Sequence, residues 1–123
     1  MISIEAIQNH KYDLVKAKAA SHISSEMVEE IMQFHQSIGN KETPLIALSG
    51  LAKNLGIQSL FVKDESHRLG LNAFKGLGAS YAMSKQLGKN SKIEVFCTAT
   101  DGNHGKAVAW MANKLGKKAV IYM

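Results

Sequence analysis

The sequence predicts an α/β fold with a three-layer architecture, in which helices flank a parallel sheet. Two observations support this prediction. Short apolar segments of the kind found in buried strands occur at residues 59–63, 94–99 and 119–123. Segments with helical apolar periodicity lie between them, at residues 73–87 and 103–115. This alternating order favours parallel pairing through right-handed crossover connections.

The N-terminal part of the chain predicts an arm followed by a helix. Residues 1–25 show weak periodicity and are expected to form an irregular arm ahead of a domain that spans residues 26–123. A helix is predicted over residues 26–38, where Ser24 or Ser25 can cap the first turn. The apolar face of this helix comprises Met27, Ile31, Phe34 and Ile38.

Turn and cap signals mark the elements that follow. Pro44 predicts a turn or an extended lead-in, because proline restricts the residue before it to extended conformations. Regularly spaced leucines indicate a short helix over residues 48–55 that ends at Gly56. The helix after the first strand is expected to be capped by Asn72 and to end at Gly88.

The composition bounds the class of protein. The 123 residues are 46% hydrophobic and 20% charged, which is typical of one globular domain. The formal charge is +5, but the lysines form no basic stripe, so nucleic-acid binding is not expected. Cys97 is the only cysteine, and no zinc-ligand cluster occurs. With no membrane-length apolar run and no signal-peptide core, a reducing, cytoplasmic location is expected.

The start of the helix at 73–87 carries a lysine that could be reactive. Lys75 falls in the first turn, where the helix dipole disfavours positive charge, and a neutral lysine can form a Schiff base with an aldehyde. Gly76 and Gly78 each cost the helix up to about 1 kcal/mol relative to alanine, so close approach of another group to the backbone is expected. Taken alone, the spacing favours an ordinary surface lysine at this position.

A second polar junction precedes the next helix. Residues 100–105 (TDGNHG) contain two glycines beside Asp101 and Asn103, so the loop can turn tightly and present polar groups to a ligand. An ordinary turn in which Asn103 caps the helix is the alternative. Neither junction by itself identifies a reaction.

Together the two motifs resemble those of the diaminopropionate ammonia-lyases, a branch of the fold-type-II pyridoxal 5'-phosphate (PLP) enzymes related to tryptophan synthase β. Residues 62–75 (VKDESHRLGLNAFK) are similar to the cofactor-lysine segment of that branch, which has Ala-Phe before the lysine where the wider group commonly has Ser-Phe. Residues 43–45 match the family's Thr-Pro-Leu motif, and residues 100–105 its loop at the PLP ring. The similarity covers roughly residues 30–123 and implies an incomplete N-terminal portion of this fold.

The resemblance implies a role for each site residue. Lys75 would bind PLP covalently as a Schiff base, Asn103 would hydrogen-bond its phenolic oxygen, and Phe74 would lie against its ring. Asp101 would stand near the substrate's Cα, and bases on opposite faces could accept either enantiomer. The implied reaction is β-elimination of ammonia from 2,3-diaminopropionate to give pyruvate and ammonia. The implied parent enzyme is a homodimer of amino-acid catabolism.

Four alternatives stay open. Members of the family are much longer, and their phosphate-binding glycine cup and the partner of the pyridine nitrogen lie beyond residue 123, so a fragment that is inactive in isolation is expected. A relative of serine/threonine dehydratases or threonine synthase would share cofactor and fold, although dehydratases usually carry a small residue where Asp101 stands. The chain could also be an inactive remnant. The last alternative is a small module that binds a partner through its unfinished sheet.

Overall fold

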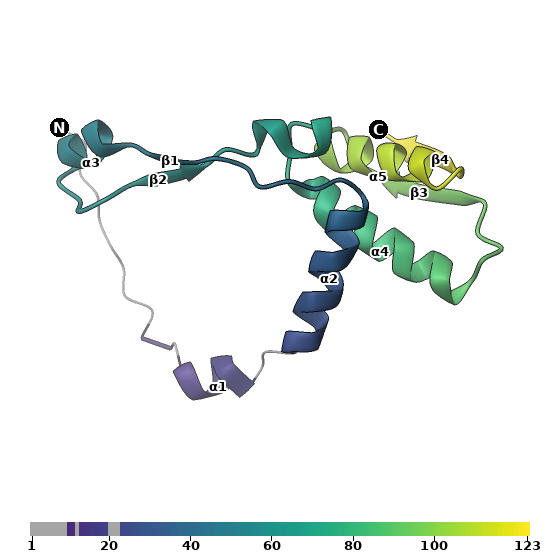
Figure 1. Ribbon diagram of the computed structural model, residues 1–123, viewed down its shortest axis with the longest axis horizontal. Coiled ribbons are helices and arrows are strands. Elements are labelled where there is room, and N and C mark those ends of the chain that lie inside the picture. The colour runs from purple at the N-terminus through teal and green to yellow at the C-terminus, as the bar shows by residue number, and fades with distance from the viewer. Residues whose placement is uncertain (1–9, 12, 20–22) are drawn as a thin grey trace.

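The structure is a computed structural model that describes residues 10–11, 13–19 and 23–123, and it confirms the α/β class (Figure 1). The helices are α1 (Leu14–Ala19), α2 (Ser25–Ser37), α3 (Ser49–Leu55), α4 (Lys75–Lys89) and α5 (Asn103–Lys114), with a 3-10 helix η1 (Glu65–Gly70). The strands are β1 (Leu45–Ala47), β2 (Phe61–Lys63), β3 (Val95–Ala99) and β4 (Lys118–Tyr122).

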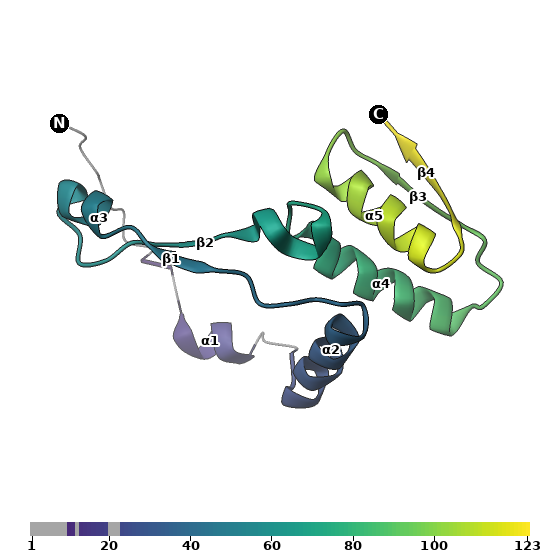
Figure 2. The same cartoon turned by 45° about the horizontal axis from the view of Figure 1, so that its top comes forward.

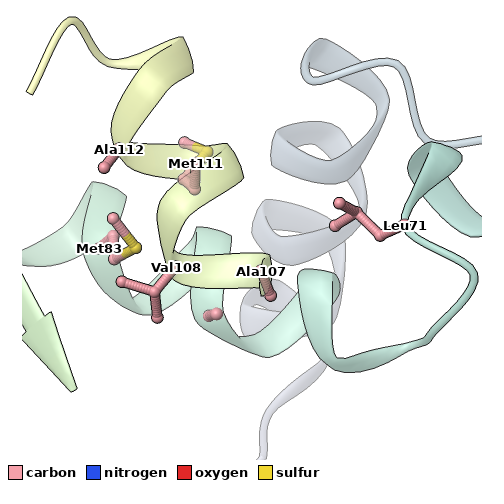
Figure 3. Close-up of a cluster of buried hydrophobic side chains, with 7 residues drawn as sticks. Leu71, Met83, Ala107, Val108, Met111 and Ala112 are labelled. Carbon is pink, nitrogen blue, oxygen red and sulfur yellow. The ribbon is translucent and has the colours of Figure 1, made fainter. Parts of the chain in front are cut away.

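The core lies around α5, which connects the parallel strands β3 and β4. These strands pair from Val95 opposite Lys118 to Ala99 opposite Tyr122, as predicted for a strand–helix–strand unit. Helix α5 packs against both strands, and α4 lies alongside α5 (Figure 2). Figure 3 shows the buried apolar side chains of this region. They are Leu71, Ala79, Met83, Ala107, Val108, Met111 and Ala112.

Small side chains let α4 and α5 approach each other closely. Ala79 from α4 and Ala107 and Ala112 from α5 are buried in the contact. Ser80 is fully buried, and its hydroxyl donates to the carbonyl oxygen of Leu77 at 3.0 Å, so its polar group is satisfied. Close packing of this kind fixes the two helices relative to each other, because a change of one methylene group is felt in a dense interior.

The prediction that the strand at 59–63 joins the same parallel sheet is wrong. Strand β2 pairs antiparallel with β1, and the two form a sheet separate from that of β3 and β4. The extended segment after Pro44 supplies this partner, and further backbone bonds join the Leu48 amide to the Leu60 carbonyl and the Asp64 amide to the Pro44 carbonyl, both at 2.9 Å. A strand that finds a neighbour so close in sequence satisfies its backbone without a crossover.

Helix α2 forms as predicted and packs on α4. The Ser24 hydroxyl accepts a hydrogen bond from the Met27 amide at 3.3 Å, which caps the helix. The rings of Phe34 and Tyr81 meet edge to face, with centroids 5.5 Å apart. His35 Nε2 lies 3.0 Å from the carbonyl oxygen of Leu77. Helix α2 is therefore held to α4 by an aromatic contact and a hydrogen bond.

The arm expected to be irregular contains a helix in its described part. The Asp13 carboxylate accepts hydrogen bonds from the amides of Val15 and Lys16, at 2.9 and 3.1 Å, and so caps α1. Residues 1–9, 12 and 20–22 of this predicted arm lie outside the described residues. Nowhere in the described ranges is a helix long and apolar enough to cross a membrane.

The predicted ends of the helix at 73–87 need correction. Asn72 does not cap α4, because it adopts a left-handed conformation (φ 58°) three residues before the helix begins. Gly88 does not end the helix, since a glycine inside a helix costs only up to about 1 kcal/mol. The helix continues to Lys89, and the Asn90 amide donates to the Gln86 carbonyl at 3.0 Å.

One face of the β3–β4 pair is exposed. Side chains alternate along both strands, and those that point toward α5 are partly buried. On the opposite face Val95, Val120 and Tyr122 are 46%, 39% and 66% exposed, beside the exposed Cys97. Apolar surface of this kind is stabilised by burial at about 25 cal/mol per Å2, which favours self-association.

We therefore expect the 123-residue chain to self-associate through this face. The double substitution Val120→Thr and Tyr122→Thr should raise the concentration at which half of the chains are associated by about tenfold or more, because apolar area is lost while the strand is retained. Sedimentation velocity measures this shift. Val28→Thr, at an exposed valine of α2, is the control, because it removes apolar area away from the strands, and it should leave the concentration unchanged. A chain that is monomeric at every concentration would contradict the expectation.

Candidate functional site

The starts of α4 and α5 come together at one end of the helix pair. Both helices run in the same direction from this end (Figures 1 and 2). The Lys106 amine, on the first turns of α5, donates to the carbonyl oxygen of Leu71, just before α4, at 3.2 Å. The two motifs singled out from the sequence therefore lie at the same end of the molecule, although they are 28 positions apart from Lys75 to Asn103.

The predicted site residues occupy the exposed rim of this end. Lys75 is the first residue of α4 and Phe74 immediately precedes it, while Asn103 is the first residue of α5 and Asp101 lies in the loop before it. All four side chains are exposed. In the described part of the chain, the Lys75 amine has no hydrogen-bond partner, so the backbone of α4 fixes only where its side chain begins.

Phe74 presents an unusual surface beside Lys75. Its side chain is 61% exposed, although phenylalanine is among the residues most stabilised by burial. An exposed aromatic ring next to a primary amine, with the carboxamide of Asn103 at the same end, can hold a planar aromatic aldehyde by stacking, by covalent attachment and by hydrogen bonding. The residue types present therefore fit a ring-shaped carbonyl cofactor. Within the described residues, no cluster of His, Cys, Asp or Glu could hold a metal ion.

Glycines make the close packing of both helix starts possible. A Cβ atom on Gly76 would lie 2.8 Å from Leu71 Cδ1 and 3.1 Å from Leu69 Cδ1, which bears out the expected close approach at this position. At Gly78 the added atom would meet nothing within 4 Å in the described part of the chain. On α5, a Cβ on Gly105 would lie 2.9 Å from Ile121 Cγ2 and 3.0 Å from Thr100 Cγ2.

The loop before α5 borders an open hollow. The Gly102 amide donates to the Thr100 hydroxyl at 3.4 Å, which folds the loop back on the end of β3. The hollow beside it has a volume of about 260 Å3. Its lining includes Thr100, Asp101, Gly102, Lys106, Ile121 and Met123. Asp101 and Lys106 thus place opposite charges at its edge.

The turn that leads into α4 is held in left-handed conformations. Leu69, Gly70 and Asn72 have φ values of 53°, 69° and 58°. Such conformations are unfavourable for a residue with a branched side chain such as leucine, and persist only where the surrounding structure holds them. Leu71, between them, is 5% exposed and belongs to the core. The segment just before the candidate lysine is therefore both strained and anchored.

Arg68 provides one anchor, and it is not predicted from the sequence. It is only 8% exposed. Its Nε and Nη2 atoms donate to the two carboxylate oxygens of Glu65 at 2.7 and 2.8 Å. Nη1 donates to Asn40 Oδ1 at 2.6 Å and to the Lys41 carbonyl at 2.7 Å, and Nη2 to the Thr43 hydroxyl at 3.0 Å. We call these residues the Arg68 cluster. Only the charge pair Glu65–Arg68, three positions apart, hints at it in the sequence.

Hydrogen bonds set the charge of Glu65. The Arg68 guanidinium, and then the Thr43 hydroxyl at 2.7 Å, lower the pKa of Glu65 from its ordinary value of 4.5 to about 2. The pKa of Arg68 is raised by the same hydrogen bond. Because the pKa of Glu65 is lower in the folded chain, the ion pair stabilises the fold fully above pH 4.5 and is lost as the pH falls toward 2.

Comparison with known proteins connects this site to a family. The model of the family described as "Pyridoxal-phosphate dependent enzyme" matches residues 36–123. The chain is 42% identical to the diaminopropionate ammonia-lyase of Salmonella typhimurium, over 85% of this chain and 31% of that protein. It is 38% identical to an L-threonine dehydratase of Haemophilus influenzae, over 66% of this chain and 15% of that protein.

A solved structure shows the same arrangement of the chain. The diaminopropionate ammonia lyase of Escherichia coli, in complex with an aminoacrylate-PLP azomethine reaction intermediate, matches with a TM-score of 0.75 and 46% identity. The match covers 81% of this chain and 29% of that one. The chain therefore spans about three-tenths of the length of the ammonia-lyases that it matches.

Gly105→Ala should destabilise the chain by about 1–3 kcal/mol, because Thr100 and Ile121 are branched at Cβ and would have to leave their preferred χ1 rotamers or shift backbone to make room. Gly78→Ala is the matched control, since it also lies in a helix but meets open space, and it should gain up to about 1 kcal/mol. Urea unfolding followed by circular dichroism measures both. Equal effects of the two substitutions would contradict the close contact at Gly105.

We expect the Glu65 carboxyl to titrate with a midpoint near 2 and, in Arg68→Met, to move back toward 4.5, since its strongest hydrogen bonds are removed. NMR observation of the side-chain carboxyl carbon measures the midpoint. Lys85→Met removes an ion pair of the same 2.7 Å length at an exposed position, and serves as control. The interpretation fails if Lys85→Met moves the Glu65 midpoint as far as Arg68→Met does.

Proposed function

Because this chain belongs to the family of pyridoxal-phosphate dependent enzymes, we propose that it forms part of an ammonia-lyase acting on 2,3-diaminopropionate. One observation carries the proposal. Residues 73–75 (Ala-Phe-Lys) and residues 101–103 (Asp-Gly-Asn) lie at the same end of the α4–α5 pair, where Lys106 bonds to Leu71, and both belong to the segment that is similar to known ammonia-lyases. The shared cofactor of that family makes a Cα proton removable, since it acts as an electron sink for the resulting carbanion.

Each site residue receives a role in this proposal. The amine of Lys75 would hold PLP through the cofactor's aldehyde carbon and, once free, would be the group that exchanges a proton with the substrate's Cα. The Asn103 amide donates a hydrogen bond to the phenolic oxygen of the cofactor, and the exposed ring of Phe74 lies against the cofactor ring. The position of Lys75, with no side-chain partner in the described part of the chain, leaves its amine available for this contact.

Asp101 is the proposed second base. It lies in the exposed loop between β3 and α5, at the edge of the hollow that also contains Lys106. A carboxylate there can take the Cα proton from the face opposite to Lys75, so that both enantiomers of the substrate can be deprotonated. Departure of ammonia from Cβ leaves 2-aminoacrylate, and its hydrolysis releases pyruvate and a second ammonia.

The similarity to a threonine dehydratase supports a second candidate function, the dehydration of serine or threonine with the same cofactor. The two reactions differ in the leaving group on Cβ, which is ammonia in one and water in the other. Asp101 favours the ammonia-lyase, because dehydratases usually have a small residue at this position.

Whichever reaction holds, we propose a cytoplasmic enzyme of amino-acid catabolism that acts as a homodimer, with residues 26–123 as part of its catalytic domain.

A chimaera in which residues 36–123 replace the matching segment of the Escherichia coli enzyme tests the function. It should release pyruvate from D- and L-2,3-diaminopropionate, and Lys75→Ala should abolish both activities. Asp101→Asn should reduce turnover of one enantiomer by about 100-fold or more and the other far less, because one face loses its base. A coupled pyruvate assay measures all of these rates. Turnover of L-threonine alone would reject the ammonia-lyase in favour of a dehydratase, and equal losses on both enantiomers would assign Asp101 a structural role.

A further inference from the structure

We propose that Arg68 is a positioning residue for Lys75, and that it acts through the left-handed turn at residues 69–72, which begins in the last two residues of η1 and leads to α4. The proposal rests on the proposed function only in taking Lys75 as the cofactor lysine. The mechanical link between Arg68 and Lys75 depends on contacts within the chain alone. It follows a path of direct contacts from the Arg68 cluster, through residues 69–72, to the first turn of α4.

The first step is the guanidinium of Arg68. Its five hydrogen bonds go to Glu65, twice, and to Asn40, Lys41 and Thr43. A guanidinium has five N–H donors in a rigid plane, so every donor is used. Because its partners lie both in η1 and in the segment 40–43, Arg68 fixes the direction in which the chain leaves η1. A lysine cannot reproduce this, since its ammonium has three donors at a single point.

The second step is the turn itself. Directly after Arg68, the residues Leu69, Gly70 and Asn72 are left-handed. The Leu71 amide donates to the Arg68 carbonyl at 2.9 Å, and the Leu71 carbonyl accepts from Lys106 at 3.2 Å. The turn is thus tied to the Arg68 cluster on one side and to α5 on the other. Without the first tie, the left-handed Leu69 would relax to a more favourable conformation.

The third step transfers the position of the turn to Lys75. The side chains of Leu69 and Leu71 lie over Gly76, at a distance that leaves no room for a Cβ atom there. Gly76 directly follows Lys75, so a shift of either leucine moves the first turn of α4. No hydrogen bond within the described residues holds the Lys75 amine, so the backbone of α4 fixes where its side chain begins and in which direction it leaves the helix. A displacement of about 1 Å can cost a reacting group about 100-fold in rate.

The experiment uses the 123-residue chain and two independent measurements. In the first, the chain is incubated with PLP and reduced with borohydride, which fixes the cofactor on whichever lysine has bound it. Peptide mass spectrometry then gives the share of chains that carry the label at Lys75, which does not depend on the number of other lysines. In the second, amide hydrogen exchange is compared between residues 69–77 and residues 95–122. The variants are Arg68→Lys, which keeps the charge, and Lys85→Met, which removes the exposed ion pair with Glu30.

We expect Arg68→Lys to lower the share of label at Lys75 by about tenfold and to speed exchange at residues 69–77 by about tenfold, with exchange at residues 95–122 unchanged. Lys85→Met should change neither. Unchanged labelling and exchange in Arg68→Lys would overturn the proposal, as would a uniform rise in exchange over both segments. If the unsubstituted chain shows no preference for Lys75, the pyruvate assay of the chimaera decides the proposed function, while faster exchange confined to residues 69–77 would still establish the mechanical link.

Discussion

The close contact between α4 and α5 is the constraint on which the candidate site depends. Ala79, Ala107 and Ala112 make it possible, since larger side chains would separate the helix axes. Because the two helices run in the same direction, their starts meet, and with them the two loops that carry polar residues. Gly105 has the same effect between α5 and the sheet, because the absence of a side chain lets α5 pack directly on Ile121. The site is a consequence of small residues placed where bulk would be disruptive.

Local signals predict much of this fold, and contacts distant in sequence account for what they miss. The Ser24 cap, the helix α5 and its parallel strands follow from patterns within a few residues, and the structure contains them. The antiparallel pairing of β2 with β1 does not follow, because a strand pattern states which face is apolar and not which neighbour it will find. The predicted cap at Asn72 is wrong, since asparagine suits both a cap and a left-handed turn.

The sequence predicts the residues of the candidate site, but it does not predict the residues that hold them in position. Two short motifs identify Lys75 and Asn103 through a family resemblance, and the structure brings their helices together. Arg68 has no such signal, because three of its partners lie 25 to 28 positions away in the chain. A sequence pattern marks the groups that touch a ligand more readily than the groups that hold them in place, and the latter depend on tertiary contacts.

The β1–β2 hairpin has a consequence for how the chain opens. Its strands bond to each other, and all their side chains are exposed, so it adds little to the core around α5. The Arg68 cluster, which joins residues 40–43 to η1, lies between this hairpin and that core. The molecule therefore divides into two cooperative units of unequal strength, with the cluster as their coupling. The β1–β2 hairpin can therefore unfold locally while β3, α5 and β4 stay folded. The hydrogen bonds of the Arg68 guanidinium keep this local unfolding from spreading to Lys75.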